Sequence, residues 1–172
     1  MDRFRRAAAL LFLLPSLFAA ASRAAEPEPD ILSAARECAE DYALPLSLLL
    51  AVCETESGFD PASGNGTCEG LMGLHRDYAG AYARLAGLED YDLHDIRDNL
   101  RIGACILADY CARYDLHRAL MCYNLGERGA RESGLSQTRY SRLVCERMAR
   151  YEESSAVLPA GRPEAPDDPL LF

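Results

Sequence analysis

The sequence predicts a single, all-helical domain, and three features of the chain lead to this prediction. Apolar residues recur at helical spacing through most of residues 30–152, no stretch shows strand-like alternation, and clusters of Gly, Pro, Asn and Asp separate the helical stretches. A chain of 172 residues that is almost half apolar is long enough for one compact core and short for two ordinary domains.

The N-terminal segment has the layout of a secretory signal peptide. Arg3, Arg5 and Arg6 precede an apolar run over residues 7–21, and small residues follow it. The run holds about 15 residues, fewer than the roughly 20 that a membrane-spanning helix needs, which disfavours a retained anchor. We expect cleavage after Ala24, which leaves a secreted, periplasmic or cell-envelope protein with no stable membrane insertion.

Helices then follow one another to the end of the domain. Asp30 can cap the first, while Pro45 and Gly58 suit the start and the end of the second. The expected helices cover residues 30–42, 46–57, 70–85, 99–114, 116–124 and 137–152, with loops at 60–69 and 87–97 and a polar connection at 127–136. Prolines punctuate residues 153–172, which we expect to be a disordered tail after a domain of residues 25–152.

The net charge disfavours some classes of binding partner, and the cysteine content indicates the kind of cellular compartment. The chain has a formal net charge of −9, and loss of residues 1–24 makes it more acidic, because that segment holds four arginines and one aspartate. Nucleic acid and anionic membranes are therefore poor partners. Export to an oxidising compartment predicts disulfide bracing among the cysteines, with many pairings possible. The seven are Cys38, Cys53, Cys68, Cys105, Cys111, Cys122 and Cys145.

Glu56 is the carboxylate that the helical pattern singles out. Leu49, Val52 and Cys53 precede it by seven, four and three residues, so they share its helical face and direct Glu56 toward the interior. Loss of hydration there raises the pKa of a carboxyl, which lets it hold the proton that a general acid needs. Glu54 lies on another face, where we expect it to meet solvent.

Four short motifs resemble the soluble lytic transglycosylase family. They are Glu56-Ser57-Gly58-Phe59-Asp60, Gly70-Leu71-Met72, Asn99 with Gly103, and Tyr123-Asn124-Leu125-Gly126, and the resemblance covers residues 40–151. It implies the goose-type lysozyme-like fold and a monomer that cleaves the glycan strands of peptidoglycan. No metal or cofactor is implied, and the cysteine spacings are not those of a zinc site, which disfavours a metal site with His75, His94 and His117.

The resemblance also implies a role for each matching position. Glu56 is the expected acid and then base, and the expected substrate-binding residues are Ser57, Met72, Tyr123, Asn124 and Tyr140. Met72 has core packing as an alternative, and Gly58, Phe59, Asn99 and Gly103 are expected to be structural. The family usually has Gln where this chain has Gly73, so a polar contact to substrate is missing unless His75 or Asn65 supplies it.

The implied reaction joins the muramyl 6-hydroxyl to C1 and forms 1,6-anhydro-N-acetylmuramic acid without water. The first alternative is a lysozyme-like hydrolase in which an aspartate orients water, the candidates being Asp60, Asp77, Asp90, Asp92 and Asp95. The second is a non-catalytic glycan-binding or assembly module with the same fold.

Overall fold

The computed structural model describes residues 26–157. The predicted signal peptide, residues 1–24, lies outside the described residues, as do residues 158–172 of the predicted tail. Among the described residues, no helix is both long enough and apolar enough to cross a membrane.

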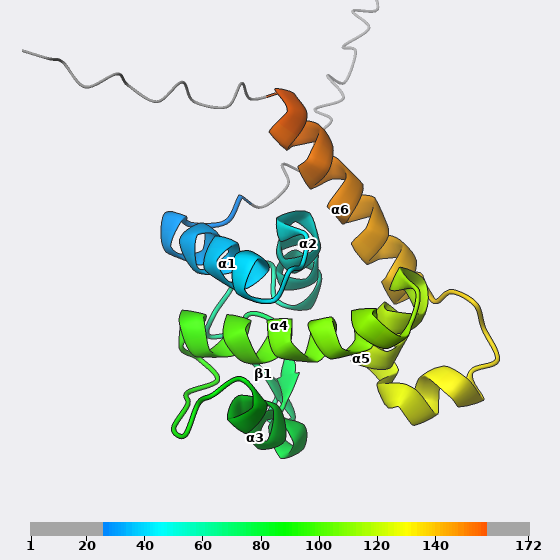
Figure 1. Cartoon of the computed structure of the whole chain (residues 1–172), viewed down its shortest axis with the longest axis horizontal. Helices are drawn as coiled ribbons and strands as arrows, with labels where there is room; N and C mark the ends of the chain where they lie inside the picture. Colours follow the sequence, from blue (N-terminus) through cyan, green and yellow to red (C-terminus); the bar gives the residue numbers. More distant parts are fainter. Residues whose placement is uncertain (1–25, 158–172) are drawn as a thin grey trace, which may run out of the picture.

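Helices account for most of the described chain, and the all-helical prediction is confirmed (Figure 1). The helices are α1 (Pro29–Asp41), α2 (Leu46–Glu56), α3 (Arg76–Leu85), α4 (Ile96–Arg113), α5 (Leu116–Glu132) and α6 (Arg139–Val157). Strands β1 (Cys68–Glu69) and β2 (Leu74–His75) pair antiparallel, with Cys68 opposite His75.

Side chains at the N-cap positions explain where three of the helices begin. Asp95 accepts hydrogen bonds from the backbone N–H groups of Arg97 and Asp98 at the start of α4. Asp115 caps α5 in the same way, and the His75 ring accepts from the N–H of Asp77 at the start of α3. Each cap satisfies a donor that has no partner within the helix.

The helix that we predicted from Gly70 begins only at Arg76. Gly70 and Gly73 have φ angles of +75° and +60°, which are incompatible with a right-handed helix. They instead form the turn between β1 and β2, so the prediction of helix over residues 70–75 is wrong. A strand signal was absent because each strand has only two residues.

The last two helices extend further than the sequence suggested. Gly126 has φ 70° and ψ 162°, which kinks α5, but the chain resumes helical geometry and continues to Glu132. Part of the segment expected as a polar connection is therefore helical. Helix α6 continues to Val157, beyond the domain boundary predicted at Glu152.

Helix α4 crosses the middle of the molecule, with α1 on one side and α3 on the other, and α5 packs near its C-terminal end (Figure 1). Helix α2 packs against both α1 and α6. Six successive α2 residues, 48–53, are buried, so this helix has no broad solvent face. The core therefore surrounds the helix that carries Glu56.

The seven cysteines are free thiols in the structure, so the predicted disulfide bracing is not shown. They are spread over α1, α2, β1, α4, α5 and α6. Burial raises the pKa of Cys38 to about 11, and it also raises the pKa of Cys53. Thiols with such pKa values stay protonated near neutral pH and are poor nucleophiles.

Candidate functional site

The C-terminal end of α2 places Glu56 in the wall of a cavity of about 800 Å³. The other walls come from the β1–β2 hairpin, α3, α4 and α5. Of the site residues expected from the sequence, Glu56, Tyr123 and Asn124 line the cavity, whereas Ser57, Met72 and Tyr140 do not.

Among the described residues, Glu56 accepts one side-chain hydrogen bond, and its donor comes from the last helix. The Tyr140 hydroxyl on α6 donates to Glu56 Oε1 over 2.6 Å. Burial raises the pKa of Glu56, the Tyr140 hydrogen bond lowers it, and the net direction is upward from the ordinary value of 4.5. The carboxyl therefore keeps its proton to a higher pH than a solvent-exposed glutamate, as a general acid requires.

Gly73 lies directly against this carboxyl. A Cβ atom at position 73 would come within 2.6 Å of Glu56 Oε2, and the φ angle of +60° is itself unfavourable for other residues. Glu56 thus occupies the space into which a side chain at position 73 would project. The departure from the family Gln has a steric reason in this structure.

Tyr123 and Asn124 approach the cavity from α5, just before its kink at Gly126. The Tyr123 hydroxyl donates to the backbone carbonyl of Met72 over 2.7 Å, which joins α5 to the turn of the hairpin. Burial, together with the charge of Glu56, raises the pKa of Tyr123 well above its ordinary value. Tyr123 is therefore a neutral phenol, and Asn124 is the exposed polar residue of the pair.

Ser57 and Met72 lie outside the cavity lining and stabilise the segments that form it. The Ser57 hydroxyl donates to the carbonyls of Cys53 and Leu71, over 3.1 Å and 2.8 Å, and so ties the end of α2 to the hairpin turn. Met72 is fully buried, and a Cβ at Gly103 would come within 2.3 Å of its sulfur. The position of Met72 therefore fits core packing rather than contact with a substrate.

Asn99 holds the same turn from α4. Its side-chain oxygen accepts from the N–H of Met72 over 2.8 Å, and its amide donates to the carbonyls of Glu69 and Leu93 over 3.1 Å and 2.7 Å. Asn99 is completely buried. It satisfies the backbone groups of Met72 and Leu93, which lie outside the helices and strands, and adds a bond to the last residue of β1. These contacts agree with the structural role expected for it.

None of the candidate aspartate partners of Glu56 lines the cavity. Asp60 accepts from the N–H of Ala62, Asp92 from that of His94, and Asp95 caps α4. Among the described residues, Glu127 is the other carboxylate in the cavity wall, and it is ion paired with Arg113.

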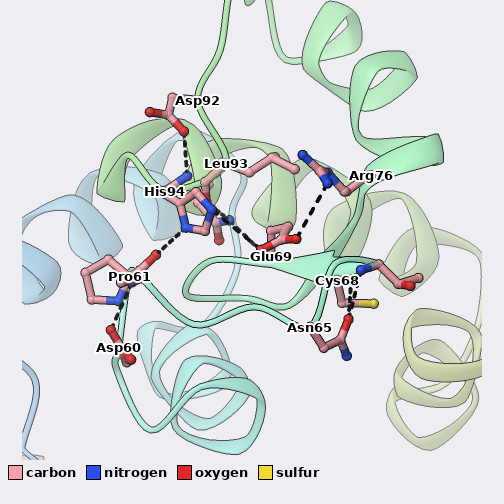
Figure 2. A network of polar contacts seen from close by, with 12 residues as sticks. Asp60, Pro61, Asn65, Cys68, Glu69, Arg76, Asp92, Leu93 and His94 are labelled. Atoms are coloured by element: carbon pink, nitrogen blue, oxygen red, sulfur yellow. Dashed lines mark hydrogen bonds and ion pairs between the residues drawn. The ribbon is translucent and has the colours of Figure 1, made fainter.

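Figure 2 shows a separate polar network around Glu69 that holds the loop of residues 60–69 in place. His94 Nε2 lies 3.5 Å from the Glu69 carboxylate, and His94 Nδ1 lies 3.1 Å from the carbonyl oxygen of Pro61. A Cβ at Gly64 would come within 1.8 Å of the same carboxylate. In the described part of the chain, no group of three or more His, Cys, Asp or Glu residues is arranged to hold a metal.

Two features of the site differ from what the sequence predicted or were not predicted from it. Glu54 does not meet solvent as expected, because its side chain is only 8% exposed and is held by Arg147, Arg150 and Tyr151 of α6. Tyrosines also line the cavity at positions 78, 82 and 110. The four-residue spacing of the first two on α3 is a signal for such a wall, because residues so spaced share a helical face.

Comparison with known proteins agrees with the fold. The family model of the transglycosylase SLT domain matches residues 33–142. Among solved structures, the chain resembles an inactive glutamate-to-glutamine variant of the lytic transglycosylase Slt from Pseudomonas aeruginosa, with a TM-score of 0.64 and 22% identity. The match covers 72% of this chain and 24% of that one. No curated protein matches the sequence.

The family match spans well over half of the chain and includes α2, the hairpin, α4 and α5. The similar structure has the same lysozyme-like helical fold. This chain belongs to the transglycosylase SLT domain family.

Proposed function

We propose that this protein is a peptidoglycan lytic transglycosylase of the cell envelope, with Glu56 as its catalytic acid and base. The observation that carries the proposal is the setting of Glu56: a partly buried carboxyl with a raised pKa in the wall of a large cavity. Membership of the SLT family and the inactivity of the glutamate-to-glutamine variant of the similar Pseudomonas aeruginosa enzyme support it.

In the first step, Glu56 protonates the oxygen between N-acetylmuramic acid and N-acetylglucosamine. The bond from C1 to this oxygen breaks, the N-acetylglucosamine 4-hydroxyl leaves, and the muramyl acetamido oxygen stabilises C1. Tyr140 keeps its hydrogen bond to Glu56 Oε1, so the other carboxyl oxygen, Oε2, carries the proton that is transferred.

In the second step, the Glu56 carboxylate removes the proton from the muramyl 6-hydroxyl. The hydroxyl oxygen attacks C1 and closes the 1,6-anhydro ring, and Glu56 returns to its protonated form. The hydrogen bond from the neutral Tyr140 phenol stabilises the carboxylate between the two steps, without the strong preference for the charged form that an arginine would impose.

Within residues 26–157, the cavity wall holds no second carboxylate suited to orient water, which favours this reaction over hydrolysis. Glycosidases that use water position a pair of carboxyl groups across the bond. Among the described residues, the other carboxylate in the cavity wall is Glu127, whose charge is balanced by Arg113. Residues 25–152 are the proposed catalytic region, which acts as a monomer on glycan strands once the signal peptide has been removed.

Digestion of purified peptidoglycan tests the proposal. We expect mass spectrometry to find 1,6-anhydromuramyl ends with the unmodified protein and none with Glu56→Gln at the same concentration. Reducing muramyl ends in place of anhydro ends would show a hydrolase. Equal solubilisation by both proteins would overturn the role of Glu56, and no solubilisation by either would favour the non-catalytic module.

A further inference from the structure

The fold fixes the hydrogen-bonding state of His75, which is a residue of the cavity wall. It is the second residue of β2 and the N-cap of α3, and it lines the same cavity as Glu56. Its Nδ1 accepts a hydrogen bond from the N–H of Asp77 over 3.3 Å. A nitrogen that accepts from a backbone amide carries no proton, so in the neutral ring the proton is on Nε2.

The Nε2–H of His75 is therefore a hydrogen-bond donor that is available to a ligand. Among the described residues, none accepts a hydrogen bond from it, and the ring also lines the cavity. Asn65, the other candidate for the role of the family Gln, has different partners. Its side-chain oxygen accepts from the N–H groups of Thr67 and Cys68, and it does not line the cavity.

Tyr78 adds an aromatic surface next to this donor. Its ring centroid lies 4.8 Å from that of His75, with the two planes tilted by 43°. Tyr78 lines the cavity and yet is 65% exposed, which makes it one of the most exposed large apolar side chains among the described residues. An exposed aromatic ring beside a polar donor at a cavity mouth is typical of a ligand contact.

The chemistry of the pair matches an amide that bears a methyl group. The cap of α3 uses Nδ1 as an acceptor, so the ring presents a single N–H donor to the cavity, which matches the single carbonyl oxygen of an amide. Asp77 in the first turn of α3 disfavours an anionic group. The tyrosine ring supplies apolar contact area beside the donor.

We propose that His75 and Tyr78 form a binding pair for the N-acetyl group of a glycan residue, with Nε2–H donating to the acetamido carbonyl and the Tyr78 ring packing on the methyl group. This inference rests on the proposed function, because it assumes that the cavity binds an N-acetylated glycan. It makes His75 a specificity-determining residue that supplies the polar group which Gly73, without a side chain, cannot offer.

Binding measured without turnover tests the pair. In the Glu56→Gln background, isothermal titration compares a β-1,4 hexamer of N-acetylglucosamine with cellohexaose, which is uncharged and lacks acetamido groups. The parent should bind the N-acetylated hexamer more tightly than cellohexaose. Adding His75→Ser should weaken binding of the N-acetylated hexamer roughly tenfold and leave that of cellohexaose unchanged. Serine keeps the cap of α3 and removes the ring donor.

Matched variants separate the pair from general effects. Tyr78→Leu should weaken binding of the N-acetylated hexamer severalfold, and Tyr78→Phe should restore it because the ring is kept. His94→Ser, which removes a histidine outside this cavity, should leave the affinity for both ligands unchanged. Equal affinities of the parent and the His75→Ser variant for the N-acetylated hexamer would overturn the inference, as would failure of the parent to bind it.

The two proposals fail in different ways. If the parent binds the N-acetylated hexamer in a manner that depends on His75 but the unmodified protein releases no anhydromuramyl ends, the proposed reaction is wrong and the binding pair stands. If anhydromuramyl ends form and the His75→Ser variant keeps its preference for the N-acetylated hexamer, the binding pair is wrong and the reaction stands.

Discussion

Glu54 and Glu56 lie two residues apart on α2, and α6 gives them different partners. Glu54 faces Arg150, Arg147 Nε at 3.7 Å and the Tyr151 hydroxyl at 2.7 Å. Glu56 receives one hydrogen bond, from the neutral Tyr140, and the described residues form no ion pair with it. Guanidinium groups stabilise a carboxylate, whereas burial beside a phenol allows a carboxylic acid to persist. The partners on the neighbouring helix therefore determine which of the two is suited to the proposed role of acid.

The largest difference between the two should appear in turnover. Glu56→Gln should lower the rate of anhydromuramyl formation about 10³-fold or more, because it removes the proton donor. Glu54→Gln should leave the rate per folded molecule within about twofold, since the ion pairs that it weakens lie outside the cavity. Product formation, normalised to folded protein by circular dichroism, measures both. A folded but equally inactive Glu54→Gln variant would contradict the division of roles.

Gly73→Ala should have the next largest effect on Glu56. Its Cβ would push against Glu56 Oε2 from 2.6 Å, and a displacement near 1 Å of a catalytic group lowers rates on the order of a hundredfold. Gly66→Ala is a matched control, because Gly66 also has a left-handed φ, +84°, but has nothing within 4 Å of the added Cβ. Both variants should lose roughly 1–2 kcal/mol of stability, because alanine is strained at a left-handed φ, and only Gly73→Ala should lose most of its activity. Equal activities would contradict a steric role for Gly73.

The sequence was sufficient to predict the helical class and most helix boundaries, but not the caps. Asp30, the predicted cap of α1, lies inside its first turn, and the aspartates that cap α4 and α5 were not predicted. The hairpin could not be predicted, because its strands have two residues each and its geometry depends on left-handed angles at Gly70 and Gly73. A glycine after a helical stretch usually marks its end, so the sequence did not show that the chain becomes helical again after the kink at Gly126.

The site was predicted where it depends on local spacing and missed where it depends on packing between helices. Helical periodicity placed Glu56 on an apolar face, but the same argument predicted that Glu54 is exposed to solvent. That prediction is wrong because nothing in the local sequence shows that α6 covers that side of α2. Met72 is buried because Gly103 of α4 lets it approach closely, a contact across thirty-odd residues of sequence. The direction of Tyr140 toward Glu56 also depends on how α6 packs.

Tyr140→Phe should make a smaller change in rate and a diagnostic change in pH dependence. The hydroxyl lowers the pKa of Glu56, so its removal should raise that pKa further. Since the first step requires protonated Glu56, the alkaline limb of the kcat/KM profile should move to higher pH. The rate at the optimum should fall roughly tenfold as the carboxylate loses its donor. Tyr151→Phe, which removes the phenol next to Glu54, should leave the profile unchanged. A shift of the limb to lower pH would contradict the assignment.

The smallest effect should be on the pH dependence of stability, where the two glutamates again differ. The folded-state pKa of Glu56 lies above its ordinary value of 4.5, so the folded state binds more protons than the unfolded state between these two values. Stability from this group is fully present below about pH 4.5 and is lost as the pH rises through the folded pKa. Glu56→Gln removes that loss, so its Tm should exceed that of the parent at pH 8, and the difference should fade near pH 4.

Glu54→Gln should instead lower the Tm at pH 8, because Arg150 and Arg147 lose their partner. Thermal unfolding of the three proteins at several pH values checks the direction of both changes in Tm. A Glu56→Gln variant that is less stable than the parent at pH 8 would show that the folded state stabilises Glu56 as a carboxylate rather than as an acid.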